Sequence, residues 1–275
     1  NGALLIGPSI AGVLIAFFGE GPCFILNGIS YLALIGALFF MNIPEKKIAS
    51  GNLQVGRGIL EGARYAFHSV PIRSILLLVA LVSFMGVSYM LLMPVFAANV
   101  LRGGPQAFGY LMSATGVGAL IGAVFLASRR NIIGLAKLIV VAGVFYGLGL
   151  SALSLSHYLV LSLLIAVVIG TTLMLQMASS NTILQTIVDD SMRGRVISLF
   201  VMARRGVEAF GSLLAGVLAH NFGTPDTLLI GGIVCLIASL AFATKVSLLK
   251  NASISFYTER QAMKLAVAVD RAVSG

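Results

Sequence analysis

Charged residues are scarce in this chain. They make up 10% of its 275 residues, whereas soluble globular domains carry about 25%. Hydrophobic residues make up 59%, and the mean hydropathy is +1.03. So few charges cannot cover the surface of a soluble domain of this length. The composition therefore predicts a membrane protein, with lipid as the solvent for much of its exterior.

Residues that support metal, redox or nucleophilic chemistry are also rare. Cys23 and Cys235 both lie in apolar runs, so we expect neither a disulfide framework nor a metal site. The three histidines, His68, His157 and His220, have no Cys, Asp or Glu at ligand spacing. No phosphate-binding loop or nucleophile motif occurs, and no secretory signal peptide is visible at Asn1. We therefore expect no cofactor, no metal and no enzymatic activity.

Long apolar runs dominate the rest of the sequence. A helix needs about 20 mostly apolar residues to cross a hydrocarbon core about 30 Å thick. Eight segments meet or approach this requirement, and the first of them is short. They are Ala3–Phe18, Cys23–Met41, Ile75–Ala98, Ala107–Ser128, Ile132–Leu155, Tyr158–Ile183, Val196–Ala219 and Thr227–Val246. The expected fold is an all-α membrane protein with eight transmembrane helices.

The positive charges alternate between the connections. Of the 18 Lys and Arg residues, most lie in every second connection and in the C-terminal tail, and the opposite connections hold only Arg102. Cytoplasmic loops of membrane proteins carry such an excess, so these connections and the C-terminus are expected to be cytoplasmic. The same pattern accounts for the net charge of +9, so we do not expect nucleic acid as a partner. The cations are Lys46, Lys47, Arg57, Arg64, Arg73, Arg129, Arg130, Lys137, Arg193, Arg195, Lys245, Lys250, Arg260, Lys264 and Arg271.

One connection, residues 42–74, is long enough to hold structure of its own. Apolar residues recur there at helical spacing opposite Glu61 and Arg64, which predicts an interfacial helix. They are Ile59, Ala63, Ala66, Phe67 and Val70. Residues 248–275 are expected to form a cytoplasmic tail. The sequence is compatible with either a weakly amphipathic helix or a solvated extension there.

A repeat relates the first and seventh spans. Residues 7–14 match residues 211–218 without a gap, and Phe18-Gly19 matches Phe222-Gly223 at the same offset. The offset is 204 residues, which is the distance between the first span and the seventh. The repeating unit is therefore six spans long. Parallel six-helix repeats are typical of the major facilitator superfamily. We therefore expect residues 1–41 to be the last two helices of an N-terminal bundle and residues 75–247 a complete C-terminal six-helix bundle, with the first four helices absent from this chain.

Three motifs extend this resemblance to one branch of the superfamily. The run Gly7-Pro8-Ser9-Ile10-Ala11-Gly12 resembles the antiporter motif of drug/proton antiporters, with Ala11 where Gly is usual. Residues 60–65 and 189–198 resemble the central-loop helix and the loop before the eleventh helix of enterobactin exporter-like proteins. The resemblance implies a twelve-helix, proton-coupled exporter of a siderophore, a macrolide or another amphiphilic molecule.

Three charged residues fall within the seventh span. Glu208 lies about 18 Å into the membrane from Val196, and Arg204 and Arg205 are spaced to pair with it. Charges at such depth usually face a cavity or a pathway. We expect a substrate or proton site in which Glu208 titrates. The alternative is that Arg204 extends to the cytoplasmic interface and Arg205 and Glu208 form a structural pair.

Other residues are candidates for the pathway or for gating. Thr172, Gln176 and Ser179 share one face of the sixth span, where they either line a pore or hydrogen-bond between helices. Gly7, Pro8, Gly12 and Gly211 either permit close packing or allow the bending on which a transporter depends. Asp189, Arg193 and Arg195 form a cytoplasmic charge cluster, which either locks one state or only sets the topology.

The leading functional hypothesis is an efflux permease of the bacterial inner membrane that works by alternating access and proton antiport. Its expected partners are membrane lipid, a small-molecule substrate and protons, and we expect a monomer. A lipid or lysolipid flippase is an alternative within transport. A truncated remnant or an accessory membrane subunit that transports nothing is the alternative outside it.

Overall fold

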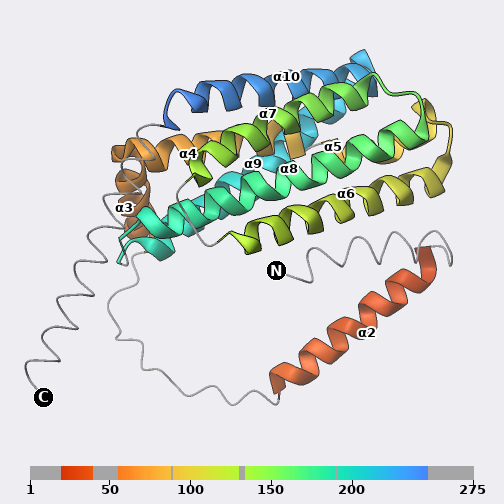
Figure 1. Cartoon of the computed structure of the whole chain (residues 1–275). Coiled ribbons are helices and arrows are strands. Elements are labelled where there is room, and N and C mark those ends of the chain that lie inside the picture. Colours follow the sequence, from red (N-terminus) through yellow and green to blue (C-terminus); the bar gives the residue numbers. More distant parts are fainter. Residues whose placement is uncertain (1–19, 40–54, 88, 130–133, 190, 247–275) are drawn as a thin grey trace, which may run out of the picture.

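The computed structural model describes residues 20–39, 55–87, 89–129, 134–189 and 191–246. Every regular element in these ranges is a helix, and the longest helices lie alongside one another in a bundle (Figure 1). The elements are α2 (Glu20–Phe39), α3 (Val55–His68), α4 (Val70–Leu81), η1 (Val82–Val87), α5 (Tyr89–Val95), η2 (Phe96–Val100), α6 (Gly104–Ser128), α7 (Leu135–Ser154), α8 (Leu159–Ile187), α9 (Arg193–Phe222) and α10 (Thr224–Ala243). The chain is an all-α membrane protein, as its sequence predicts.

Five helical segments among the described residues are long and apolar enough to cross a membrane. They are Val70–Val100, Gly104–Ser128, Leu135–Ser154, Leu159–Ile187 and Thr224–Ala243. Each overlaps a predicted span. The predicted seventh span coincides with α9, a helix of 30 residues whose five charged side chains lower its apolar character. The predicted count of eight spans is not confirmed, because the first of them lies outside the described residues.

The first helix of the bundle is irregular. Its α-helical parts α4 and α5 alternate with the two π-helical segments η1 and η2. Pro94 lies inside α5 and cannot donate a backbone hydrogen bond, so the regular pattern is interrupted just before η2. A π-helical turn widens the helix and is frequent at functional sites.

Proline and glycine define several helix ends. Pro71, Pro105 and Pro225 each occupy the first turn of a helix, where the missing N–H would have no partner in the helix. Gly223 has φ of +89° and separates α9 from α10 with a single residue. A side chain is strained in this conformation, so the glycine permits the abrupt reversal.

Glycines let the helices of the bundle approach closely. Between α6 and α8, a Cβ added at Gly118 would overlap the carbonyl oxygen of Val167, and one added at Gly170 would overlap that of Thr115. Thr171 Oγ1 also donates to the Gly118 carbonyl at 2.9 Å, which joins the two helices. Small residues and interhelical hydrogen bonds are the usual means by which helices associate in lipid.

The pair formed by α7 and α10 packs in the same way. A Cβ at Gly147 would lie 2.7 Å from the Gly232 carbonyl oxygen, closer than side chains ever approach. Gly232 in turn contacts the backbone of α7 at Ser151. Dispersion contacts of this kind stabilise the bundle because lipid offers no hydrophobic driving force between helices.

Helix α2 is separate from the bundle in Figure 1, and its described apolar side chains are largely exposed. Phe39, for example, is 86% exposed. An apolar helix with such a surface requires lipid or further helices around it. The interfacial helix predicted in residues 42–74 is present as α3, at one end of the bundle (Figure 1). The first predicted span with Gly7, Pro8 and Gly12, and the tail 248–275, lie outside the described residues.

Candidate functional site

The charges predicted to lie within the membrane are halfway along α9. Glu208 is about 22 Å from the first residue of this helix and about 21 Å from its last. Arg205 Nη1 donates to Glu208 Oε2 at 3.4 Å. The Arg205 side chain is 58% exposed and that of Glu208 only 24% exposed. This ion pair therefore lies midway along α9, with its carboxylate less exposed than its guanidinium.

Arg204 occupies a different position from Arg205. Its residue is half-buried, on the same side of α9 as the buried residues Gly211 and Ala215. It lies within electrostatic range of Glu208, and so does the Tyr146 hydroxyl of α7. The α9 charges therefore interact with the interior of the bundle as well as with its surface.

The polar residues of α8 lie inside the bundle. Thr172 donates to the carbonyl oxygens of its own helix at Val168 and Ile169. Gln176 is fully buried, and a Cβ at Gly143 of α7 would lie 3.1 Å from its Nε2 atom. Ser179 is also fully buried. All three side chains are thus buried within the bundle, away from the exposed surface on which Arg205 lies.

Several buried polar atoms in this interior have no hydrogen-bond partner within the described residues. They are Oε1 and Nε2 of Gln176, Oγ of Ser83, Ser179 and Ser180, and the hydroxyl of Tyr146. Buried polar groups usually have a partner, and an ordered water commonly supplies it. The interior of the bundle is therefore polar as well as tightly packed.

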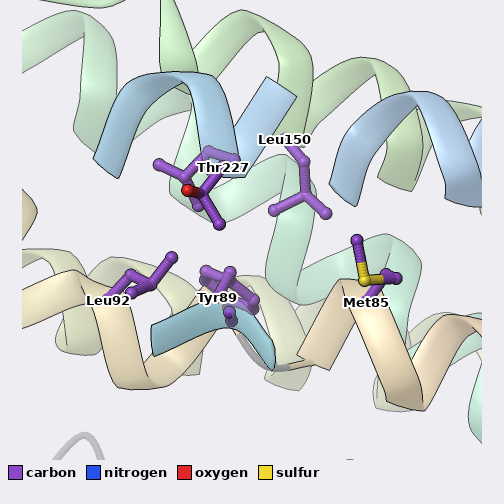
Figure 2. Close-up of a pocket in the computed structure, with 7 residues that line it drawn as sticks. Met85, Tyr89, Leu92, Leu150 and Thr227 are labelled. Carbon is purple, nitrogen blue, oxygen red and sulfur yellow. The ribbon is translucent and has the colours of Figure 1, made fainter. Parts of the chain in front are cut away.

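One cavity inside the described bundle is small. A small cavity lies between the irregular first helix and α7, α9 and α10, with Met85, Tyr89 and Leu92 on one side and Leu150 and Thr227 on the other (Figure 2). It leaves about 10 Å³ for the centre of a water molecule. That is room for about one water, whereas small-molecule sites enclose about 300–1,000 Å³. This cavity is therefore too small to hold a small-molecule substrate.

The cytoplasmic charge cluster is joined to α3. Arg195 Nη1 donates to Glu61 Oε2 at 2.6 Å, and the Tyr65 hydroxyl donates to Asp189 Oδ2 at 3.0 Å. Gly62 lies directly against Arg195, since a Cβ there would be 2.8 Å from the Arg195 Cβ. These contacts, which we call the α3–α9 latch, hold the interfacial helix against the connection between α8 and α9.

Tyr65 is suited to its role as a donor in this latch. Its partial burial raises the pKa of the hydroxyl above the usual 10.0. The backbone hydrogen bond from Asp189 lowers this pKa, whereas the hydrogen bond to the Asp189 carboxylate and the charge of that carboxylate raise it. The group therefore stays protonated at neutral pH. The pKa of this hydroxyl is higher in the folded state than in the unfolded state. The protonated hydroxyl therefore contributes to stability below about pH 10, and this contribution is lost as the pH rises further.

The latch predicts a specific disulfide. In the variant Gly62→Cys/Arg195→Cys with Cys23→Ser, oxidation is expected to join positions 62 and 195. A Cβ at position 62 would lie 2.8 Å from that of residue 195, so a shift of about 1 Å between the helices brings the two Cβ atoms to the separation of about 3.5–4.5 Å that a disulfide requires. The bond is detected by mass spectrometry of peptides. The matched pair Leu60→Cys/Arg195→Cys should stay reduced, since Leu60 is 69% exposed on another face of α3. Equal oxidation of both pairs would contradict the docking of α3.

Sequence reasoning missed the partners of this cluster. Asp189 and Arg195 are close together in the sequence and were grouped on that basis. Their partners, Tyr65 and Glu61, come from a helix more than 120 residues earlier. The spacing of Glu61 and Tyr65, one turn apart on α3, is the signal that would have indicated a shared contact face. Gly211 is buried on α9, as expected of a packing residue.

No group of His, Cys, Asp and Glu that would hold a metal ion occurs among the described residues. The buried Cys235 is a packing residue against Gly86 and Tyr146. The chemistry that remains for the described helices is recognition and ion pairing on α9.

Comparison with known proteins identifies the family. A family model described as "Transmembrane secretion effector" matches residues 1–273. The Staphyloferrin A transporter of Staphylococcus aureus is 26% identical over 86% of this chain and 59% of its own length. The Multidrug efflux pump Tap of Mycolicibacterium fortuitum is 25% identical over 83% of this chain and 56% of its own length.

A third relative is similar over nearly the same part. It is an uncharacterized MFS-type transporter, YfmI, of Bacillus subtilis, which is 23% identical over 91% of this chain and 64% of its own length. The chain thus spans about three fifths of the length of the curated relatives it matches. Because the family model covers almost all of it, the chain belongs to the transmembrane secretion effector family of the major facilitator superfamily, whose proteins are multi-pass membrane transporters and not enzymes.

Proposed function

We propose that this chain acts in a secondary active efflux permease of the bacterial plasma membrane, which exports a small amphiphilic molecule by alternating access in exchange for protons. Two relatives are named as a transporter of staphyloferrin A and as a multidrug efflux pump, which favours a small-molecule substrate. The observation that carries the proposal is the charged group halfway along α9. Charges at this depth are costly unless they serve a pathway.

The permease is proposed to contain two bundles. Helices α4 to α10 form one of them, and residues 1–41 are assigned to the other because of the 204-residue repeat. The substrate is proposed to bind between them, since the cavity inside the described bundle has room for only about one water molecule. The C-terminal tail is proposed to lie on the cytoplasmic side, because it shares the excess of cations that is typical of cytoplasmic connections.

Glu208 is proposed to carry the exchanged proton. Within helices α4 to α10, it is the acidic side chain that lies away from the helix ends. Its ion pair with Arg205 favours the charged form, and separation of the two groups in another state would favour protonation. Such a change of partner is a physical means of coupling proton binding to a change of conformation.

The α3–α9 latch is proposed to stabilise one of the two states. Its contacts of Glu61 with Arg195 and of Tyr65 with Asp189 bridge elements that are distant in the sequence. Arg193 belongs to the same region at the start of α9. Exposed ion pairs contribute only about 0–1 kcal/mol each, so the latch can be broken at little cost. That is a useful property for a contact that must open in each cycle.

Proton coupling is tested with Glu208→Gln in the whole protein, reconstituted in liposomes with an imposed pH gradient. We expect the wild-type protein to accumulate the dyes rhodamine 123 and fluorescein when the gradient is imposed. The accumulated dye is extracted from the liposomes and measured by chromatography. The variant should lose this accumulation, because a neutral amide cannot carry a proton. It should retain counterflow of dye in the absence of a gradient.

The matched control is Asp226→Asn, which alters an exposed carboxylate in the first turn of α10, outside the α3–α9 latch. Unchanged gradient-driven accumulation in Glu208→Gln would remove Glu208 from the coupling mechanism. Failure of the wild-type protein to move either dye, together with scrambling of labelled phospholipid, would replace efflux with a lipid flippase.

A further inference from the structure

The hydroxyl of Tyr146 is a buried donor that the folded bundle leaves unused. Tyr146 is fully buried on α7, and its hydroxyl has no hydrogen-bond partner in the part of the chain that the structure describes. A side chain enclosed in this way is closed to any segment outside the bundle unless the helices move apart. A buried hydroxyl without a partner costs free energy, so a state of the protein that supplies one is stabilised by it.

The face of α7 that carries Tyr146 is turned toward α9. Leu150, one turn after Tyr146, lines the small cavity of Figure 2 together with Ala215 of α9. Ala215 comes two turns after Glu208, on the same face of α9. The cavity therefore lies between the two helix faces that carry Tyr146 and Glu208.

A glycine lets the Tyr146 hydroxyl reach η1. A Cβ at Gly86 of η1 would lie 3.2 Å from the hydroxyl oxygen and 2.7 Å from the ring of Tyr146. This segment also packs against α9, so η1 contacts both the Tyr146 side chain and the helix that carries Glu208. The carboxylate of Glu208 is less exposed than the guanidinium of Arg205, and it is within electrostatic range of the Tyr146 hydroxyl.

Few titratable groups surround Glu208. Arg204 and Arg205 come from its own helix. Among the described elements that pack against α9, η1 and α8 carry no titratable side chain, and the charged side chains of α3, α4 and α10 lie near the ends of the bundle. Tyr89 of α5 and Cys235 of α10 remain, and a phenol and a thiol are ordinarily uncharged at neutral pH. Loss of contact with the two arginines therefore leaves Glu208 among neutral groups, where the protonated form is favoured.

We propose that the Tyr146 hydroxyl is the hydrogen-bond partner of Glu208 when Glu208 is protonated. The carboxylate leaves Arg205, takes up one proton from water, and accepts a hydrogen bond from the Tyr146 hydroxyl at its carbonyl oxygen. Two buried polar groups then satisfy each other. This inference rests on the proposed proton-carrying role of Glu208, and it names the residue that stabilises the neutral form.

The test observes Glu208 directly, by infrared difference spectroscopy of the whole purified protein in phosphatidylcholine liposomes as the pH is lowered. A protonated carboxyl group has a C=O stretching band, and the band of Glu208 is the one that Glu208→Gln lacks. Tyr146→Phe removes the hydroxyl and keeps the ring. We expect the band to move to higher frequency, because the carbonyl oxygen loses a hydrogen bond, and the pH of half-protonation to fall by about 0.5–1 pH unit.

The matched control is Tyr89→Phe. Tyr89 is also a buried tyrosine, with its ring edge-on to that of Tyr146, but its hydroxyl lies near Thr115 of α6. This variant should leave the band and the half-protonation pH of Glu208 unchanged. Thermal unfolding of both variants shows whether the helices remain folded. A purely structural role of the Tyr146 hydroxyl would lower the unfolding temperature of Tyr146→Phe without moving the band, and would overturn the inference.

An unchanged band and half-protonation pH in Tyr146→Phe, or equal changes in Tyr89→Phe, would overturn the inference while Glu208 remains the proton carrier. A higher half-protonation pH in Tyr146→Phe would also overturn it, since Tyr146 would then bind the charged carboxylate. Absence of a Glu208 band at every pH at which the protein is folded would instead remove Glu208 as the proton carrier, and the inference with it.

Discussion

The variant Gly118→Ala is expected to lose most of the stability of the bundle. The added methyl group would overlap the Val167 carbonyl oxygen, which belongs to the backbone of α8 and cannot rotate away. The two helices would have to separate, and the hydrogen bond from Thr171 to the Gly118 carbonyl would be lengthened or lost. We expect a loss of about 3 kcal/mol or more, at the upper end of what overpacking costs.

The measurement uses the buried thiol of Cys235. This residue is fully buried, so a thiol-reactive fluorophore labels it only when the bundle unfolds. In a Cys23→Ser background, the labelling temperature in detergent should fall steeply for Gly118→Ala. Gly216→Ala on α9 is the matched control, because nothing lies within 4 Å of a Cβ there. Similar labelling temperatures for both variants would show that α6 and α8 are not in close contact.

The second large effect is expected at Tyr146. This side chain is fully buried on α7, against Gly86 and Cys235, with its ring edge-on to that of Tyr89 at a centroid distance of 6.4 Å. Tyr146→Ala would leave a cavity at the junction of three helices. Removal of a buried aromatic side chain costs about 3–5 kcal/mol.

The variant Tyr146→Phe distinguishes the contribution of the ring to stability from that of the hydroxyl. The hydroxyl has no hydrogen-bond partner among the described residues, so its removal should leave the unfolding temperature unchanged or raise it. A large loss of stability in Tyr146→Phe would indicate that an ordered water satisfies this hydroxyl. A small loss in Tyr146→Ala would contradict the packing of Tyr146 between α10 and η1.

Much of this architecture is readable from the sequence. The apolar runs predict the long helices because the thickness of the membrane sets their length, and the amphipathic spacing from Ile59 to Val70 predicts α3. The depth of Glu208 and its spacing from Arg205 predict their ion pair, since residues three apart lie on neighbouring positions of a helix. In each case the signal is local, within one helix.

The features that escaped prediction depend on contacts between helices. Apolar composition does not show which glycine of α6 faces which residue of α8, and nothing in the sequence places Gly62 against Arg195. The π-helical segments η1 and η2 also have no simple sequence signal beyond Pro94. Thr172, Gln176 and Ser179 were expected on one face, but the buried position of that face is a property of the assembled bundle.

The glycine contacts have a consequence for how such a protein can diverge. Where α6 meets α8 and α7 meets α10, backbone touches backbone, so larger residues at Gly118, Gly170 or Gly147 would destabilise the bundle. Helix α9 has only four fully buried residues in its 30 and a mostly exposed surface. Mutations can therefore accumulate on the helix that carries the charges without unfolding the rest. If α9 carries the substrate site as proposed, substitutions on α9 could change the substrate while the paired helices stay constant.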